Sequence, residues 1–186
     1  MSVSSFNSEL MQFLQQSPTP FHGVANLAQK LRANDFVQLS ESDHWDLEPK
    51  QSYFVIRNDS ALVAFKTGQG DPIAKGFRIT GAHTDSPCLK VKPSPEIRKQ
   101  NYLQLGVEVY GGALLHPWFD RDLSIAGRVD FQTKKGELKT SFINFEDPVA
   151  FIPSLAIHLN RTANDGNKIN KQRELPPILM QLGDKS

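Results

Sequence analysis

The sequence predicts an α/β protein in which helices and strands alternate in the first half and strands dominate the second. Three observations carry this prediction. Apolar residues recur at helical spacing near the N-terminus, short runs of alternating apolar residues follow, and one strand-like run ends in a histidine and an aspartate two positions apart. With 186 residues, the chain is long enough for one large or two small domains with a buried core.

The composition is that of a soluble globular protein, with 39% hydrophobic residues, 22% charged residues and a net charge of +1. No basic cluster is interleaved with aromatic residues, so a nucleic-acid partner is not expected. No apolar run approaches the ~18 residues of a membrane span, and no secretory leader is recognisable. The single cysteine, Cys88, excludes an internal disulfide and suits a reducing compartment, so we expect a cytoplasmic protein without a membrane partner.

Two helices are expected first, and both should cover a sheet. Ser4 or Ser5 is the candidate N-cap of the first helix, whose apolar stripe consists of Phe6, Leu10, Phe13 and Leu14. The prolines at 18 and 20 end this helix. The second helix has an apolar face made of Val24, Leu27, Ala28 and Leu31, and it closes at residues 34–35. His22 precedes that face without a neighbouring carboxylate, so we interpret it as structural.

A β-hairpin and a further strand are expected next. Residues 36–50 are irregular, although Trp45 and Leu47 should dock on the core. Residues 53–57 and 61–65 form the two hairpin strands around the turn residues Asn58 and Asp59. Residues 68–70 contain glycine without the spacing of a phosphate-binding loop. The apolar run at 77–82 then predicts a strand that ends at His83.

His83 and Asp85 form a pattern typical of a metal site. Residues two apart in a strand share a face, so both side chains should emerge together. A zinc-bound imidazole usually donates its second N–H to a carboxylate, which makes His83 a candidate ligand and Asp85 its orienting partner. The alternative is a surface histidine beside a surface aspartate. Cys88 is a possible further ligand, but a lone cysteine on an extended segment is more typical of a small buried apolar residue.

The second half has the alternation of extended strands. Leu89, Val91 and the apolar residues at 103, 105, 107 and 109 mark strands that Pro93 and Pro95 interrupt. A hairpin follows, with one strand around 125–131, a turn at 134–136 and a returning strand at 138–144. Leu155, Ala156 and Leu159 predict a short helical face, and a polar loop follows at 161–174. The apolar stretch at 176–182 begins an element and stops, which indicates a truncated chain.

Four stretches occur in the order found in one enzyme family. They are Gly81-Ala82-His83-Thr84-Asp85-Ser86-Pro87, Tyr110-Gly111-Gly112, Trp118-Phe119-Asp120-Arg121-Asp122-Leu123 and Ile152-Pro153-Ser154-Leu155-Ala156-Ile157-His158-Leu159. Read together, the chain resembles the aspartyl-aminopeptidase family of zinc metalloaminopeptidases. The resemblance implies the first part of a split zinc-aminopeptidase α/β catalytic domain at 1–88. An inserted β-rich oligomerisation domain, incomplete here, would occupy 89–186.

The resemblance also implies the site and its chemistry. His83 is the first metal ligand, and Asp85 is the catalytic-site carboxylate that orients it. His158 is either a metal ligand or a substrate-binding residue that reaches a neighbouring subunit's site. Two zinc ions per complete site, a peptide substrate with an acidic N-terminal residue and a homo-oligomer are expected. The general base and remaining ligands would lie beyond residue 186, so this chain alone should be inactive.

Two other functions are consistent with some of the residues. A non-catalytic β-rich assembly or binding module would explain the second half, and zinc content discriminates it from the enzyme. A serine hydrolase would use Ser86 beside His83 and Asp85. That alternative is disfavoured, because no Gly-x-Ser-x-Gly motif exists and Pro87 restricts the turn. His116 lies in the loop between residues 111 and 122, where the structural interpretation is preferred.

Overall fold

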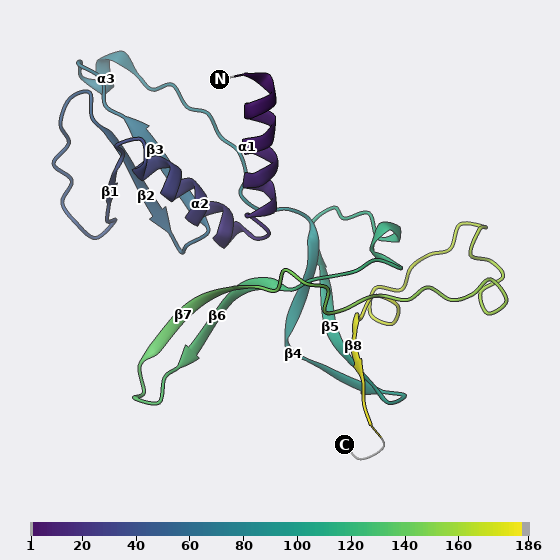
Figure 1. Cartoon of the computed structure of the whole chain (residues 1–186). Helices are drawn as coiled ribbons and strands as arrows, with labels where there is room; N and C mark the ends of the chain where they lie inside the picture. Colours follow the sequence, from purple (N-terminus) through teal and green to yellow (C-terminus); the bar gives the residue numbers. More distant parts are fainter. Residues whose placement is uncertain (1, 184–186) are drawn as a thin grey trace. The chain divides into compact units, whose positions relative to one another are not determined.

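The computed structural model describes residues 2–183, which form two compact units (Figure 1). The first unit contains the described residues up to Asp85 together with residues 126–143, and the second contains residues 86–125 and the described residues from Asn144 onward. The predicted α/β class is confirmed, whereas the division into domains at 1–88 and 89–186 stays a prediction. Among the described residues, no helix has the length and apolar character needed to cross a membrane.

Two helices open the first unit, as predicted. They are α1 (Val3–Gln15) and α2 (Pro20–Arg32). The predicted cap of α1 is wrong, because Ser2 is the N-cap and its hydroxyl accepts a hydrogen bond from the Ser5 N–H at 3.2 Å. Thr19 caps α2 and Pro20 takes the first helical position, where its missing N–H has no helical partner to lose. Val24 and Ala28 of α2 are buried, but no residue of α1 is, so α1 does not cover a sheet.

A three-stranded sheet lies in the same unit, with β1 (Val37–Leu39), β2 (Ser52–Arg57) and β3 (Ala61–Lys66) in that order. The hairpin β2–β3 is confirmed, and Asn58 and Asp59 have positive φ in the three-residue loop between the paired residues Arg57 and Ala61. The prediction of irregular structure was wrong at β1, which pairs in parallel with β2. Three residues are too few to reveal a strand by alternation.

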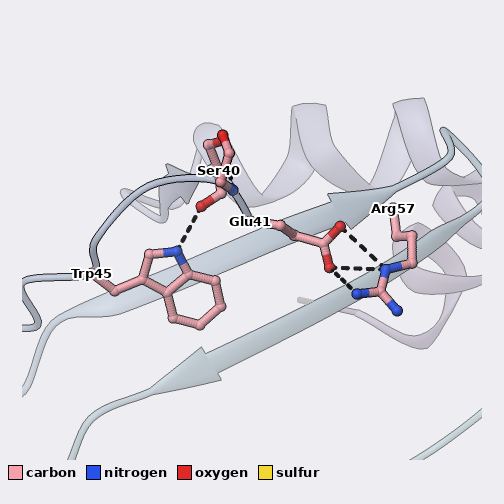
Figure 2. Close-up of polar contacts among 5 residues, drawn as sticks. Ser40, Glu41, Trp45 and Arg57 are labelled. Carbon is pink, nitrogen blue, oxygen red and sulfur yellow. Dashed lines mark hydrogen bonds and ion pairs between the residues drawn. The ribbon is translucent and has the colours of Figure 1, made fainter.

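The connection between β1 and β2 is fixed on this sheet by polar contacts (Figure 2) and by one aromatic contact. The Arg57 guanidinium donates to the Glu41 carboxylate at 2.6 Å and 2.9 Å. Trp45 Nε1 donates to the Ser40 carbonyl at 2.6 Å, and its ring stacks on Phe65 at a centroid distance of 6.2 Å. Trp45 therefore contacts the sheet through Phe65, although the residue is 37% exposed and lies outside the buried core. Leu47 remains exposed, so its predicted docking is wrong.

A short helix and an extended segment follow the hairpin. The helix α3 (Pro72–Lys75) was not predicted, and Asp71 caps it by accepting from the Ile73 N–H at 2.9 Å. The strand predicted at 77–82 is wrong, because these residues pair with no strand of the described chain. Phe77 and Ile79 are 79% and 88% exposed. An apolar run has the propensity of a strand, but only a partner supplies the ladder hydrogen bonds.

An antiparallel sheet forms the second unit, ordered β4 (Cys88–Lys99), β5 (Tyr102–Tyr110) and β8 (Ile178–Gln181). The predicted interruption at Pro93 and Pro95 is found in the pairing with β5 but not in the strand, which is continuous. Both prolines fall in the register shift between Val91 and Glu96, where the strand does not need their missing N–H groups. The apolar stretch near residue 180 pairs with β5 as the edge strand β8.

The core of the second unit is centred on Val107, Ile152 and Leu175, all buried. The short 3-10 helix η1 (His116–Trp118) and the segment around Leu123 pack against this core. The predicted helical face after Pro153 is wrong, since the described chain has only a turn there. Leu155 and Leu159 are exposed, so no apolar face is available to stabilise a helix.

The predicted hairpin of the second half is confirmed as β6 (Ala126–Gln132) and β7 (Leu138–Asn144), with Gly136 at φ 85° in its turn. In the sequence this hairpin lies between the two segments of the second unit, but it belongs to the first unit. Phe142 lies 5.8 Å from Phe21 and 5.6 Å from His22, measured between ring centroids. The Arg128 guanidinium lies 4.8 Å from the centroid of the Phe21 ring. The start of α2 is therefore covered by this hairpin.

Candidate active-site residues

His83 and Asp85 are in contact in the first unit, as their spacing predicted. The His83 Nδ1 lies 2.7 Å from the Asp85 backbone carbonyl and 3.1 Å from its Oδ1. Both partners are acceptors when the carboxyl is ionised, so this geometry places the ring proton on Nδ1. Nε2 is then the nitrogen that carries the lone pair. It is the atom that could bind a metal, and the metal-binding role itself stays a prediction.

Thr84, between these two residues, ties the segment to the turn of the hairpin β2–β3. Its hydroxyl donates to the Ser60 carbonyl at 2.7 Å. This bond restrains the backbone from which both site side chains project, without using either of them. Sequence reasoning missed this contact, because the acceptor is a backbone carbonyl 24 positions away and no side-chain pattern marks it.

The pair by itself is too small and too exposed to hold an ion. The side chains of His83 and Asp85 are 80% and 38% exposed. Within residues 2–183, no group of three or more His, Cys, Asp or Glu residues is arranged to hold a metal. A catalytic zinc ion uses about three protein ligands. The pair therefore suits zinc as one ligand with its orienting partner. Cys88 lies partly buried in β4, opposite Tyr110.

Gly111 of the glycine stretch lies against Pro87, the last residue of the first motif, within the second unit. Gly111 has φ 71°, a conformation that side-chain-bearing residues rarely adopt. A Cβ built there would lie 3.4 Å from Pro87 Cγ and 3.5 Å from Pro87 Cα. The backbone conformation of Gly111 thus favours glycine, and a Cβ there would be in ordinary van der Waals contact with the residue that ends the His83 motif.

His158 lies at the surface of the second unit, within a turn. The Leu159 N–H donates to the Ala156 carbonyl at 2.8 Å, which closes the turn around it. His158 is exposed, and so are its neighbours Ile157 and Leu159. The turn therefore presents the imidazole on an apolar stretch of surface. Neither of the two roles expected for His158 is decided by this geometry.

The third and fourth motifs are joined by Asp120 and Ser154. The Ser154 N–H donates to Asp120 Oδ1 at 2.9 Å, and the Ser154 hydroxyl donates to Oδ2 at 2.5 Å. These two bonds hold the pKa of Asp120 below its usual range, the hydroxyl contributing most. From the sequence, Asp120 was named only as part of the third motif and was given no role. The 34 positions between the two residues leave no local pattern that identifies this pair.

Comparison with known proteins gives a consistent result. A family model described as "Aminopeptidase I zinc metalloprotease (M18)" matches residues 13–185. A protein of Pseudomonas putida strain KT2440, named "Probable M18 family aminopeptidase 2", is 57% identical over 178 residues, which is 96% of this chain and 41% of that protein. The chain thus spans less than half the length of the curated relatives it matches.

Solved structures agree with these relatives. A cryo-EM structure of a complex of Ape4 and Nbr1 matches 95% of this chain and 34% of its own, with a TM-score of 0.84 and 38% identity. A structure described as the mApe1 dodecamer of S. cerevisiae matches 95% of this chain and 48% of its own, with a TM-score of 0.73 and 28% identity.

Proposed function

The chain belongs to the aminopeptidase I family of zinc metalloproteases, M18, and from this membership we propose that it forms part of a zinc-dependent aminopeptidase. The proposed substrates are peptides, from which the enzyme releases N-terminal residues. An acidic N-terminal residue is the proposed preference, in line with the resemblance of the four motifs. Domains at 1–88 and 89–186 and a cytoplasmic location belong to the same proposal.

The observation that carries the proposal is the contact between His83 and Asp85. Asp85 accepts from Nδ1 of His83 through its carbonyl and its carboxylate, which leaves Nε2 for the metal. A carboxylate in this position orients the ring and raises its basicity as a ligand. Zinc, when bound, would polarise the peptide carbonyl and lower the pKa of a bound water. In this proposal Asp85 acts at the catalytic centre through His83, by holding its proton on Nδ1.

The metal shell is proposed to be shared with residues outside the described chain. His83 supplies one ligand, and a site of two zinc ions needs several more. The relatives are more than twice as long as this chain, and the proposal draws the general base and remaining ligands from the portion that this chain does not span. Residues 1–186 alone are accordingly proposed to be inactive.

His158 is proposed to contact substrate in a neighbouring subunit's site. One solved relative is described as a dodecamer, which supports a homo-oligomer here. The exposed apolar neighbours of His158 also suit a surface that a second subunit covers. A role as metal ligand is the alternative for this residue. In either role the imidazole has to be held at a fixed place, which makes the turn around it part of the proposal.

The test is the zinc content and activity of a His83→Ala variant of the full-length protein. We expect loss of hydrolysis of aspartyl and glutamyl amides together with a lower bound zinc content, measured by elemental analysis after dialysis. His44→Ala, which changes an exposed histidine of the β1–β2 connection, is the matched control. Full activity and unchanged zinc in His83→Ala would refute the assignment. Zinc-independent folding without peptide hydrolysis in the wild type would instead favour a binding module.

A further inference from the structure

We propose that Asp120 is a positioning residue that holds the turn carrying His158, acting through Ser154. The inference rests on the proposed function of His158 as a site residue, and it adds the group that fixes where this imidazole lies. Four features of the second unit support this inference. They are the backbone hydrogen bonds before Ser154, the buried side chain of Ile152, the two hydrogen bonds from Ser154 to Asp120, and the turn around His158.

The backbone before Ser154 is anchored in the core. The Leu123 N–H donates to the Ala150 carbonyl at 2.9 Å, and the Asp120 N–H donates to the Ile152 carbonyl at the same distance. Ile152 is fully buried. The segments around residues 120–123 and 150–152 therefore run side by side as a fixed pair. Ile152 is the last residue of this stretch whose side chain is buried, so the chain leaves the core immediately after it.

The next restraint comes from the Asp120 carboxylate. One of its oxygens accepts from the Ser154 N–H at 2.9 Å and the other accepts from the Ser154 hydroxyl at 2.5 Å. Two bonds from one residue fix orientation as well as distance, and bonds to an ionised acceptor are stronger than neutral ones. Among the described residues from Pro153 to Ala156, this is the side-chain contact that ties the segment to the body of the unit. The turn that carries His158 begins at Ala156, two residues after Ser154.

The backbone conformation of Asp120 determines which substitution is informative. Its φ is 53°, in the left-handed region, which aspartate and asparagine tolerate better than most residues. Asp120→Ala would add backbone strain to the loss of the carboxylate. Asp120→Asn retains the conformation and an oxygen for the Ser154 N–H, but its NH₂ group can only donate to the Ser154 hydroxyl, which reverses that bond. It thus removes the charge and the bond from the hydroxyl to an ionised acceptor, which is the stronger kind.

The experiment measures kcat and KM of the zinc-loaded full-length enzyme in a series of variants. We expect Asp120→Asn and Ser154→Ala to lower kcat by about 10-fold to 100-fold, as losses of orienting partners do, with a smaller change in KM. Ser154→Thr keeps both donors and should restore the wild-type value. Asp147→Asn, which changes an exposed aspartate of the same unit, is the matched control and should have no effect.

A double-mutant cycle separates positioning from general loss of structure. If Asp120 acts by placing His158, Asp120→Asn should change kcat by less than about 2-fold in a His158→Ala background, because the two residues act as one unit. Equal losses in both backgrounds would overturn the proposal, as would a Ser154→Thr variant as impaired as Ser154→Ala.

A structural readout keeps this inference distinct from the proposed function. NMR measurement of amide exchange at Leu159 and Asn160, whose N–H groups both donate to the Ala156 carbonyl, reports on the turn directly. Faster exchange in Asp120→Asn, but not in Asp147→Asn, supports the positioning contact. Unchanged exchange overturns it. If exchange rises while His158→Ala leaves activity intact, the contact holds and the proposed role of His158 falls.

Discussion

At His83 the chemistry depends on which ring nitrogen is already engaged. Asp85 engages Nδ1 through two oxygens, one from the backbone and one from the side chain, at 2.7 Å and 3.1 Å. The shorter contact is to the carbonyl, which no substitution at position 85 removes. The backbone carbonyl alone already favours the tautomer with the proton on Nδ1. The carboxylate adds a negative charge beside the ring and a second contact that orients it.

A graded prediction follows for Asp85→Asn. The carbonyl contact survives, so the fold and the Nδ1 tautomer should be retained, but the negative charge that raises imidazole basicity is lost. We expect zinc affinity to fall about 10-fold to 100-fold, as for other orienting residues of metal sites. Competition with a chelator of known affinity measures this. Asp46→Asn, in the exposed β1–β2 connection, is the control, and unaltered affinity at Asp85→Asn would mean that the carbonyl alone orients the ring.

The predictable part of the site is the part that is local in sequence. His83 and Asp85 are two positions apart, so alternation along an extended chain was enough to bring them together, although the segment is not a paired strand. Thr84 and Asp120 were not identified as anchors, because their partners are distant in sequence. Long-range hydrogen bonds depend on the tertiary fold, which no local pattern encodes.

Among the elements, the hairpin β6–β7 is joined to α2 by aromatic and cationic contacts. Arg128 lies against the Phe21 ring and donates to the Asn58 carbonyl at 3.2 Å, and Phe142 packs on both Phe21 and His22. A guanidinium over an aromatic face is stabilising, more so where water is excluded. The hairpin was predicted from its alternation and turn, but its docking site was not, since one strand face gives no information about which partner it meets.

His22 makes this contact sensitive to pH. Burial lowers the pKa of His22 below its ordinary value of about 6.5, so the folded unit favours the neutral imidazole while the unfolded chain binds the proton more readily. The contribution of neutral His22 to the free energy of unfolding is fully present above pH 6.5. It is lost as the pH falls from 6.5 toward the lowered pKa. Desolvation is the cause of this lowered pKa, and the charged groups that β6 brings against the neighbouring Phe21 ring are Arg128 and its ion-pair partner Asp130.

We therefore expect the free energy of unfolding of the first unit to be smaller at pH 5.5 than at pH 7.5. His22→Asn should flatten this difference while retaining a polar side chain near Thr19. A Trp118→Phe background leaves Trp45 as the fluorescent probe of the first unit during urea denaturation. His44→Asn, at an exposed position, should keep the pH dependence of the wild type. The expectation is wrong if His22→Asn and His44→Asn show the same pH dependence.

Elements that have a partner within the described chain were the ones predicted well. In the hairpins β2–β3 and β6–β7 the two strands form backbone hydrogen bonds with each other, and both hairpins were identified from alternation and turn residues. The run at 77–82 has the same apolar character and pairs with no described strand. β4 shows the opposite case, because β5 pairs with it on both sides of the two prolines. Propensity is thus decisive only where the tertiary structure supplies the missing hydrogen bonds.

At the scale of the whole molecule, the candidate residues are divided between the two units. His83 and Asp85 belong to the first unit and His158 to the second. The proposed enzyme is a homo-oligomer, in which a residue on an exposed turn can serve either its own subunit or a neighbour. Sequence reasoning could identify both histidines through the resemblance, but not which pair of chains combines them, because assembly geometry is not encoded in local patterns.

Mixing two inactive variants distinguishes these arrangements. We expect His83→Ala and His158→Ala full-length chains to be inactive or impaired separately, His158→Ala by about 10²-fold to 10³-fold in kcat if its imidazole is a preorganised donor to the substrate carbonyl. Co-assembled as verified hetero-oligomers, they should regain activity, because a site with intact His83 from one chain can receive intact His158 from the other. Mixtures that do not exchange subunits provide the control. Hetero-oligomers that remain inactive would place His158 in its own subunit's site, as a metal ligand or a substrate contact.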